Sequence, residues 1–300
     1  MDLFRDFPNT RRLAFSAVAR MTTARDFANL PVLLEGLRAA RRRLRPVDFR
    51  RMARHAAERG HVYTVLECAR AAARTGFVLA DAQTVNELLA AVQERAADAR
   101  WAAARTRQML EWAEMVGELL ESEAHGRQAR PPRPDTPARP RVRGLFPLDR
   151  DPAVTAAKLN LAASHAVKNR RGEDMPAGKV ARYARDLVGL WPAGKGLLGL
   201  YPAEAYRPKQ EMAYLTSANK LLQVGVPILH GLEMAMQVVD ADLAAELQSR
   251  RDAVAAEVEK ALETPSKRGL DIYNKYFRPE QVAEEQSGKA EGAEESEAVP

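Results

Sequence analysis

The chain has 300 residues, of which 46% are hydrophobic and 29% are charged, and its net charge is +6. This composition provides enough apolar surface for a folded core and excludes a wholly disordered chain. The single cysteine, Cys68, excludes an internal disulfide framework and a zinc site built from several cysteines. The apolar run 221–232 is shorter than the roughly 20 residues of a membrane helix, so we expect no membrane span.

The charge is distributed unevenly along the chain. Residues 280–300 contain seven glutamates and one lysine, whereas the preceding body is strongly basic. All ten lysines lie after residue 150, so the first half is basic through arginine alone. A GC-rich genome favours arginine and alanine codons and offers one explanation. Guanidinium groups also match the geometry of phosphate oxygens, and the two explanations are compatible.

Residues 1–25 form either a targeting segment or the first helix. Their five arginines and several hydroxyl residues are typical of mitochondrial transit peptides, although Asp2 and Asp6 do not fit that pattern. Residues 10–21 also have the apolar spacing of an ordinary amphipathic helix. No continuous apolar stretch indicates a secretory signal.

The rest of the chain predicts an all-α fold. Apolar residues recur at intervals of three and four, and alanine, leucine, arginine and glutamate dominate. We assign residues 10–122 to a first helical region and 151–280 to a second. In the second region we expect helices over 153–168, 177–190, 209–222, 228–239 and 241–262.

Two segments interrupt or follow these helices. Residues 123–150 are assigned to a Pro/Arg-rich linker, because five prolines between 131 and 140 cannot sustain a helix. This linker is either a solvated spacer or a basic arm that lies on RNA or in a larger assembly. Residues 281–300 are predicted to form a disordered acidic tail.

A repeat of about 36 residues organises the first region. One helix opens near Phe49 and ends at Gly60, a second ends at Gly76, and the next opens near Val85. Phe49 and Val85 are 36 residues apart, and Leu13 lies another 36 residues upstream. Stacked helix pairs of this kind share one core and leave an extended surface for long, thin partners.

The repeat resembles the pentatricopeptide repeat family over residues 10–121, and best over 47–89. Gly60 stands where that family ends its first helix, and residues 74–77 resemble its Lys-Gly-Ile turn. Asp81 followed by Thr84-Val85-Asn86 resembles its Pro-Asp-x-x-Thr-Tyr-Asn junction. Tetratricopeptide-type arrays have a similar period. The resemblance implies an α-solenoid that binds single-stranded RNA.

The same resemblance suggests RNA-contacting positions. In the family, polar residues early in the first helix and at the repeat junction read the bases, and Asn86 and Asp81 occupy such positions. Arg50 stands where asparagine, serine or threonine is expected, so we predict no target sequence. Eight arginines also lie among residues 38–54, which indicates phosphate contact. The predicted RNA-binding residues are Arg41, Arg42, Arg45, Arg50, Arg51, Asp81 and Asn86.

Two motifs in the second region were weighed and set aside. Residues 189–195 have the Gly-x4-Gly-Lys spacing of a phosphate-binding loop, but Gly196 replaces the hydroxyl residue that holds Mg²⁺. We therefore expect a turn there. Aromatic residues 191, 201 and 206 lie among cations and are interpreted either as a base-stacking cluster or as rings folded over the core.

No catalytic or metal-binding motif is present, so we expect no enzyme, cofactor, metal or small-molecule substrate. The leading hypothesis is an RNA-associated helical-repeat protein that acts in mitochondrial RNA maturation, stability or translation. The alternative is a structural mitoribosome-associated subunit or a protein-binding helical scaffold. Expected partners are single-stranded or ribosomal RNA, the mitoribosome or other mitochondrial proteins. The composition resembles fungal mitochondrial proteins, so the expected location is the mitochondrial matrix, or otherwise the cytoplasm.

Overall fold

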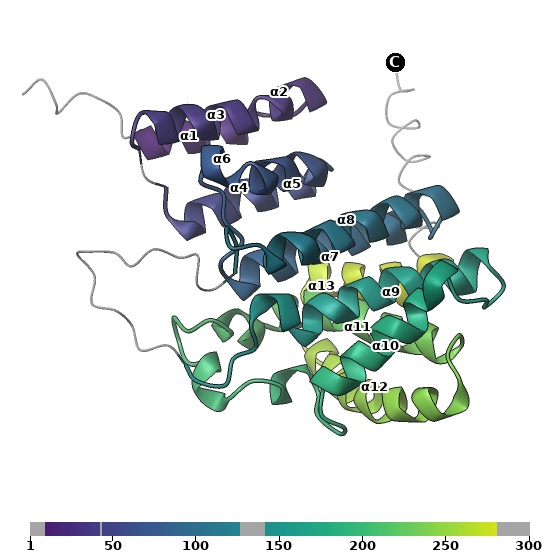
Figure 1. The fold of residues 1–300 in the computed structure, drawn as a ribbon. Helices are drawn as coiled ribbons and strands as arrows, with labels where there is room; N and C mark the ends of the chain where they lie inside the picture. The colour runs from purple at the N-terminus through teal and green to yellow at the C-terminus, as the bar shows by residue number, and fades with distance from the viewer. Residues whose placement is uncertain (1–9, 43, 127–141, 281–300) are drawn as a thin grey trace, which may run out of the picture. The chain divides into compact units, whose positions relative to one another are not determined.

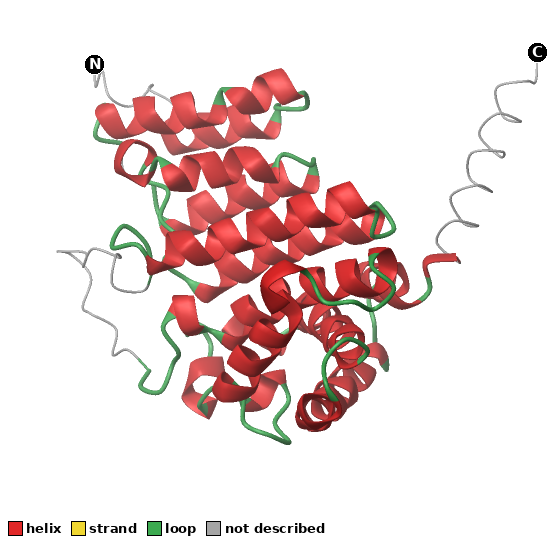
Figure 2. Ribbon diagram, turned by 45° about the vertical axis from the view of Figure 1, so that its right-hand side comes forward, coloured by secondary structure: helices red, strands yellow, loops and turns green. Residues whose placement is uncertain are grey.

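A computed structural model describes residues 10–42, 44–126 and 142–280. All regular elements within these ranges are helical, which confirms the all-α prediction (Figure 2). No helix in the described ranges is long and apolar enough to cross a lipid bilayer. Most of the predicted linker, residues 127–141, and the predicted acidic tail, residues 281–300, lie outside the described residues.

The chain divides into two compact units. Unit 1 comprises residues 1–92, 111–141 and 146–154, and unit 2 comprises 93–110, 142–145 and 155–300. Residues 93–110, which belong to the predicted first helical region, thus cluster with the second. Long helices continue from one unit into the other, which is why the division does not follow a break in the sequence pattern.

Unit 1 is built from short helices connected by tight turns (Figure 1). Helix α1 packs on α4, and α3 packs on both α5 and α6. Residues 10–19 thus form a helix, one of the two interpretations of the N-terminal segment. The helices of unit 1 are α1 (Thr10–Ala19), α2 (Ala24–Ala28), α3 (Leu30–Ala39), α4 (Pro46–Glu58), α5 (Val62–Arg70), α6 (Ala72–Thr75) and parts of α7 (Ala82–Asp98) and α8 (Ala103–Glu121).

Local signals explain where these helices begin and end. Pro46 occupies the first turn of α4, where its missing amide hydrogen costs nothing. Gly76 ends α6 with φ at +73°, a conformation that glycine adopts without steric penalty. The predicted breaks at Gly60 and Gly76 therefore coincide with helix ends.

Unit 2 is organised around a buried central helix. Helix α11 packs against α10, α12 and α13, and residues 221–232 are all buried. Short 3-10 turns cover residues 197–199, 203–206 and 213–216. The main helices of unit 2 are most of α9 (Pro152–Asn169), α10 (Lys179–Leu190), α11 (Ala218–Met236), α12 (Ala241–Leu262) and α13 (Lys267–Phe277).

Helix α11 approaches α9 closely and shares a buried polar network with it. A Cβ atom added at Gly231 would lie 2.6 Å from the Cβ of Asn160. Asn160 donates to Gln93 Oε1 over 2.8 Å, and His230 Nδ1 donates to Asn160 Oδ1 over 2.8 Å. The Trp101 ring stacks on His230 with centroids 4.8 Å apart. Burial lowers the pKa of His230 to about 3, so this histidine stays neutral and the network is satisfied.

Candidate functional site

The predicted arginine cluster lies in unit 1, from the end of α3 along α4. Arg41 and Arg42 are exposed in the turn after α3, and Arg51 is exposed on α4. Arg41 adopts a left-handed conformation with φ at +54°, and the Arg42 amide donates to the Leu37 carbonyl over 2.8 Å. The turn thus closes α3 and places two guanidinium groups in solvent.

Asp48 organises the start of α4 and is fully buried. Its carboxylate accepts a hydrogen bond from the Arg45 amide over 2.9 Å and forms ion pairs with Arg11 and with the Arg45 guanidinium. Arg45 was predicted to contact phosphate. Its guanidinium is partly neutralised by Asp48 but remains about half exposed, at 46%.

Arg50 and Asp81, two predicted RNA contacts, contact each other. The Arg50 guanidinium lies 3.3 Å from Asp81 Oδ1. The same carboxylate accepts the Thr84 amide over 2.9 Å and the Thr84 hydroxyl over 2.8 Å, which caps the start of α7. In both the Arg11–Asp48 and the Arg50–Asp81 pair, an arginine binds an aspartate near the start of a later helix: Asp48 in the first turn of α4 and Asp81 directly before α7.

Asn86 lies inside the packing of α7 with 5% of its surface exposed. The resemblance to the pentatricopeptide repeat implied a base-reading residue at this position. The structure shows a buried polar side chain instead. The residues that follow it, 87–90, are buried as well, and this all-round burial of α7 has no signature in the apolar spacing of the sequence.

A set of arginines remains exposed to solvent around these pairs. Within the described ranges, Arg45 pairs with Asp48, and none of the other members has a carboxylate partner. Arg51 lies over the Phe15 ring, 4.8 Å from its centroid, which holds one guanidinium against α1. No local sequence pattern predicts this contact, because Phe15 and Arg51 are 36 residues apart. We call the set the arginine surface: Arg38, Arg41, Arg42, Arg45, Arg51 and Arg54.

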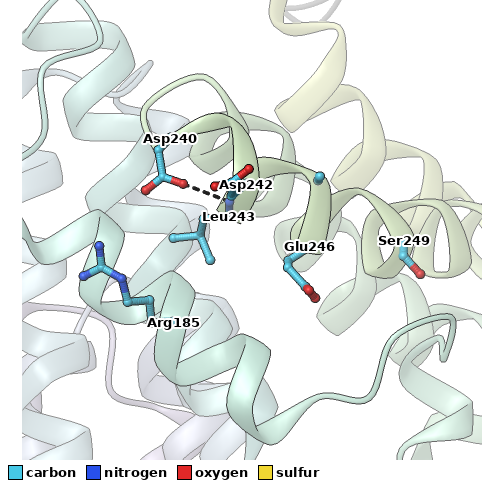
Figure 3. Close-up of a pocket in the computed structure, with 7 residues that line it drawn as sticks. Arg185, Asp240, Asp242, Leu243, Glu246 and Ser249 are labelled. Atoms are coloured by element: carbon cyan, nitrogen blue, oxygen red, sulfur yellow. Dashed lines mark hydrogen bonds between the residues drawn. The ribbon is translucent and has the colours of Figure 1, made fainter.

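A separate hollow of about 570 Å³ lies between α10 and α12 in unit 2 (Figure 3). Three of its seven lining residues are acidic, and Arg185 is the cation among its described lining residues. Asp240 is occupied in capping α12, since it accepts the Leu243 amide over 2.9 Å. The hollow therefore contrasts in charge with the arginine surface.

The motifs set aside in the second region have structural roles. A Cβ atom at Gly196 would lie 2.3 Å from the Glu257 carboxylate, which accepts the Leu198 amide over 3.0 Å. Burial raises the pKa of Glu257. Trp191 is fully buried and its indole donates to the Lys195 carbonyl over 2.7 Å. The glycine makes room for a carboxylate, and this ring folds over the core.

Cys68 and His125 are buried in unit 1. Burial raises the pKa of the Cys68 thiol to about 12. His125 Nδ1 accepts the Leu79 amide over 3.0 Å, so its Nε2 donates to the Ala69 carbonyl at 3.1 Å. The described part of the chain contains no group of three or more side chains placed to hold a metal ion. Both residues serve the packing of the unit.

A family model and a curated relative both match most of the length of this chain. The family model described as mitochondrial ribosomal protein mS27 matches residues 1–278. The small ribosomal subunit protein mS27 of Neurospora crassa is 34% identical over 275 residues, covering 87% of this chain and 68% of the relative. The chain therefore belongs to the mitochondrial ribosomal protein mS27 family, and its location is mitochondrial.

Proposed function

We propose that the protein is a non-catalytic structural subunit of the small mitochondrial ribosomal subunit, located in the matrix, where it binds ribosomal RNA. Family membership carries this proposal, and the name of the Neurospora relative supports the small subunit. The match favours the ribosomal alternative over the leading sequence hypothesis of RNA maturation. Ribosomal RNA and neighbouring ribosomal proteins are the proposed partners.

The arginine surface is the proposed RNA contact in unit 1. Its guanidinium groups repel one another, and a polyanion would relieve that repulsion while releasing counterions. Arg41 and Arg42 extend from a turn, and Arg51 is held by Phe15, so the cations are partly ordered before RNA arrives. Backbone phosphates suit this arrangement because they accept the forked donors of arginine.

The solenoid and pentatricopeptide-like features also belong to this proposal. The repeated Arg11–Asp48 and Arg50–Asp81 pairs support stacking of successive helix pairs. Arg50 and Asp81 are engaged with each other, and Asn86 is buried. We therefore assign these three residues to ordering the surface, and we propose recognition of the RNA backbone rather than of individual bases.

A sedimentation experiment tests the proposal. The tagged chain, expressed in mitochondria of its source, is followed through sucrose gradients at increasing salt. We expect it to sediment with small ribosomal subunits at moderate salt. The triple variant R42Q/R45Q/R51Q should dissociate at lower salt, because it lacks three phosphate contacts.

The control is R70Q/R74Q, which removes two arginines of unit 1 that lie outside the arginine surface and pair with glutamates. It should behave like the parent chain. A parent chain that remains at the top of the gradient at moderate salt would contradict the ribosomal assignment. A triple variant indistinguishable from the control would contradict the assignment of the arginine surface.

A further inference from the structure

We propose that unit 2 carries a second cationic surface that binds the sugar–phosphate backbone of RNA. This inference rests on the proposed function for the identity of its ligand. No local sequence pattern marks these cations, because they come from three separate segments of the chain. The second cationic surface consists of Arg100, Arg107, Lys168, Arg170 and Arg171.

Direct contacts bring the segments together. The Asn169 side chain, at the end of α9, donates to the Trp101 carbonyl in the turn after α7 over 2.9 Å. A Cβ atom at Gly172 would lie 3.9 Å from the Gln237 carbonyl at the end of α11. Helices α7, α9 and α11 therefore end close together within unit 2. The turn after α7 and the turn after α9 both contain arginine.

The cations of this surface are not neutralised by neighbouring acids. Within the described ranges, Arg100, Arg107, Lys168 and Arg171 are exposed and have no carboxylate partner. Arg170 donates to the Asp174 backbone carbonyl over 3.3 Å. Two acids near the surface, Asp98 and Asp174, are engaged with other partners. Asp98 pairs with Lys275 over 2.8 Å, and the Asp174 carboxylate accepts backbone amides at the start of α10, from Val180 over 2.8 Å.

Backbone conformation gives a second reason to assign a role to these side chains. Arg100 has φ at +49° and Arg171 has φ at +55°, a region in which glycine is normally favoured. Arg41, at the end of α3, has φ at +54°. After both α3 and α7, the amide of the residue that follows the arginine donates a hydrogen bond to the carbonyl five residues earlier. These bonds run from Arg42 to Leu37 and from Trp101 to Ala96. Arg41 of the arginine surface and Arg100 of the second cationic surface thus occupy the same position in a helix-closing turn.

The electrostatic environment agrees with the geometry. Burial and then the positive charges of Arg107 and Arg170 lower the pKa of His165, which lies one turn before Asn169. Lys168 acts in the same direction on buried His230. A cation beside a helix C-terminus also interacts favourably with the helix dipole, and the experiment below separates that role from RNA binding.

The ligand class follows from the charge and the donor geometry. Several exposed cations presented from rigid turns suit a polyanion with regularly spaced charges, and arginine forks match phosphate oxygens. A protein of this family would meet RNA backbone at such a surface. Two cationic surfaces on two units would attach the chain to RNA at two places, which strengthens binding without base recognition.

The test replaces two arginines with glycine. The double variant R100G/R171G removes two charges and places glycine where the backbone is already left-handed, so we expect the fold to be retained. The matched control R182Q/R185Q removes two exposed charges from α10 in the same unit, and Arg185 there borders the acidic hollow of Figure 3. Thermal unfolding of all chains confirms that the variants are folded.

Binding of full-length chains to a fluorescent 30-nucleotide RNA hairpin is measured over a range of salt concentrations. For R100G/R171G we expect affinity to fall about tenfold at moderate salt. The slope of log affinity against log salt should decrease by about 1.5, the value for two lost phosphate contacts. The control should retain the parent affinity and slope.

The outcomes separate this inference from the proposed function. If R100G/R171G binds like the parent while R42Q/R45Q/R51Q binds weakly, the second cationic surface is wrong and the proposed function stands. An equal loss in R182Q/R185Q would show a net-charge effect and would also overturn the second surface. If the parent binds no RNA and does not sediment with ribosomal subunits, the proposed function itself fails.

Discussion

Replacing Arg250 with methionine removes a buried guanidinium that closes the end of α10. Its side chain is 4% exposed, its Nε donates to the Trp191 carbonyl over 2.6 Å, and its Nη2 donates to the Val188 carbonyl over 3.1 Å. It also contacts the backbone carbonyl and the carboxylate of Glu246 on its own helix α12. A single side chain thus satisfies the last carbonyls of one helix from another.

The expected cost of R250M follows from these contacts. The carbonyls of Val188 and Trp191 each lose a charged donor at a partly or fully buried position, and such a loss costs about 1–3 kcal/mol. Methionine recovers part of the apolar packing, so we expect the free energy of unfolding to fall by about 3 kcal/mol. R250K should lower the free energy of unfolding by less than R250M, because an ammonium group keeps the positive charge. Some cost should remain, because the ammonium group cannot reach both carbonyls as the guanidinium does.

The assay is urea unfolding of the full-length chain, followed by tryptophan fluorescence because Trp191 lies at the affected helix end. The neighbouring variant R251M is the matched control, since Arg251 is 31% exposed and pairs with the exposed Asp252. It should change stability by less than about 1 kcal/mol. A loss of under about 1 kcal/mol in R250M, or an equal loss in both variants, would refute the capping role.

Three further predictions concern glycine, histidine and cysteine. G231A should lower the free energy of unfolding by about 2–3 kcal/mol in urea titrations, because its Cβ would lie 2.8 Å from the Asn160 Cα. G189A has nothing within 4 Å and should instead gain up to about 1 kcal/mol from helix propensity. Burial holds the pKa of His125 below its usual 6.5, so the unfolded chain binds this proton at higher pH than the folded chain. The stability contributed by His125 should be complete above about pH 7 and decrease as pH falls to 5, and H125Q should show a smaller decrease in urea midpoint. The Cys68 thiol, with a pKa near 12, should not react with a disulfide reagent at pH 8 until the chain is unfolded.

Each of these three predictions has an outcome that would contradict it. Equal stability of G231A and G189A would contradict the close approach of α11 to α9. An unchanged pH dependence in H125Q would contradict the neutral, doubly bonded histidine. Reaction of Cys68 in the native chain, at a rate close to that of a free thiol, would contradict its burial.

Local sequence patterns predicted much of the fold. The apolar spacing and the glycine stops located α4, α5 and the start of α7, because these signals act within a few residues. The predicted helix over 209–222 is confirmed only from residue 218, since turns that include the 3-10 segment 213–216 precede the start of α11. The predicted division of helices before residue 228 is wrong. Helix α11 continues through Pro227, because packing against α12 and α13 outweighs one lost backbone hydrogen bond.

The candidate site was predicted less completely, for a physical reason. Composition located the arginines, but ion pairing depends on residues distant in sequence. Asp48 lies 37 residues from Arg11, and Asp81 lies 31 residues from Arg50. Burial of Asn86 likewise depends on tertiary packing. The second cationic surface joins segments almost 70 residues apart through the Asn169–Trp101 hydrogen bond, and no local pattern marks it.

Crosslinking the tagged chain to RNA in cells and sequencing the recovered fragments tests the central claim most directly. A structural subunit of the small mitochondrial ribosomal subunit should yield a few discrete segments of its ribosomal RNA, with little messenger RNA. Recovery of discrete organellar messenger segments without ribosomal RNA, or of no RNA at all, would contradict the claim.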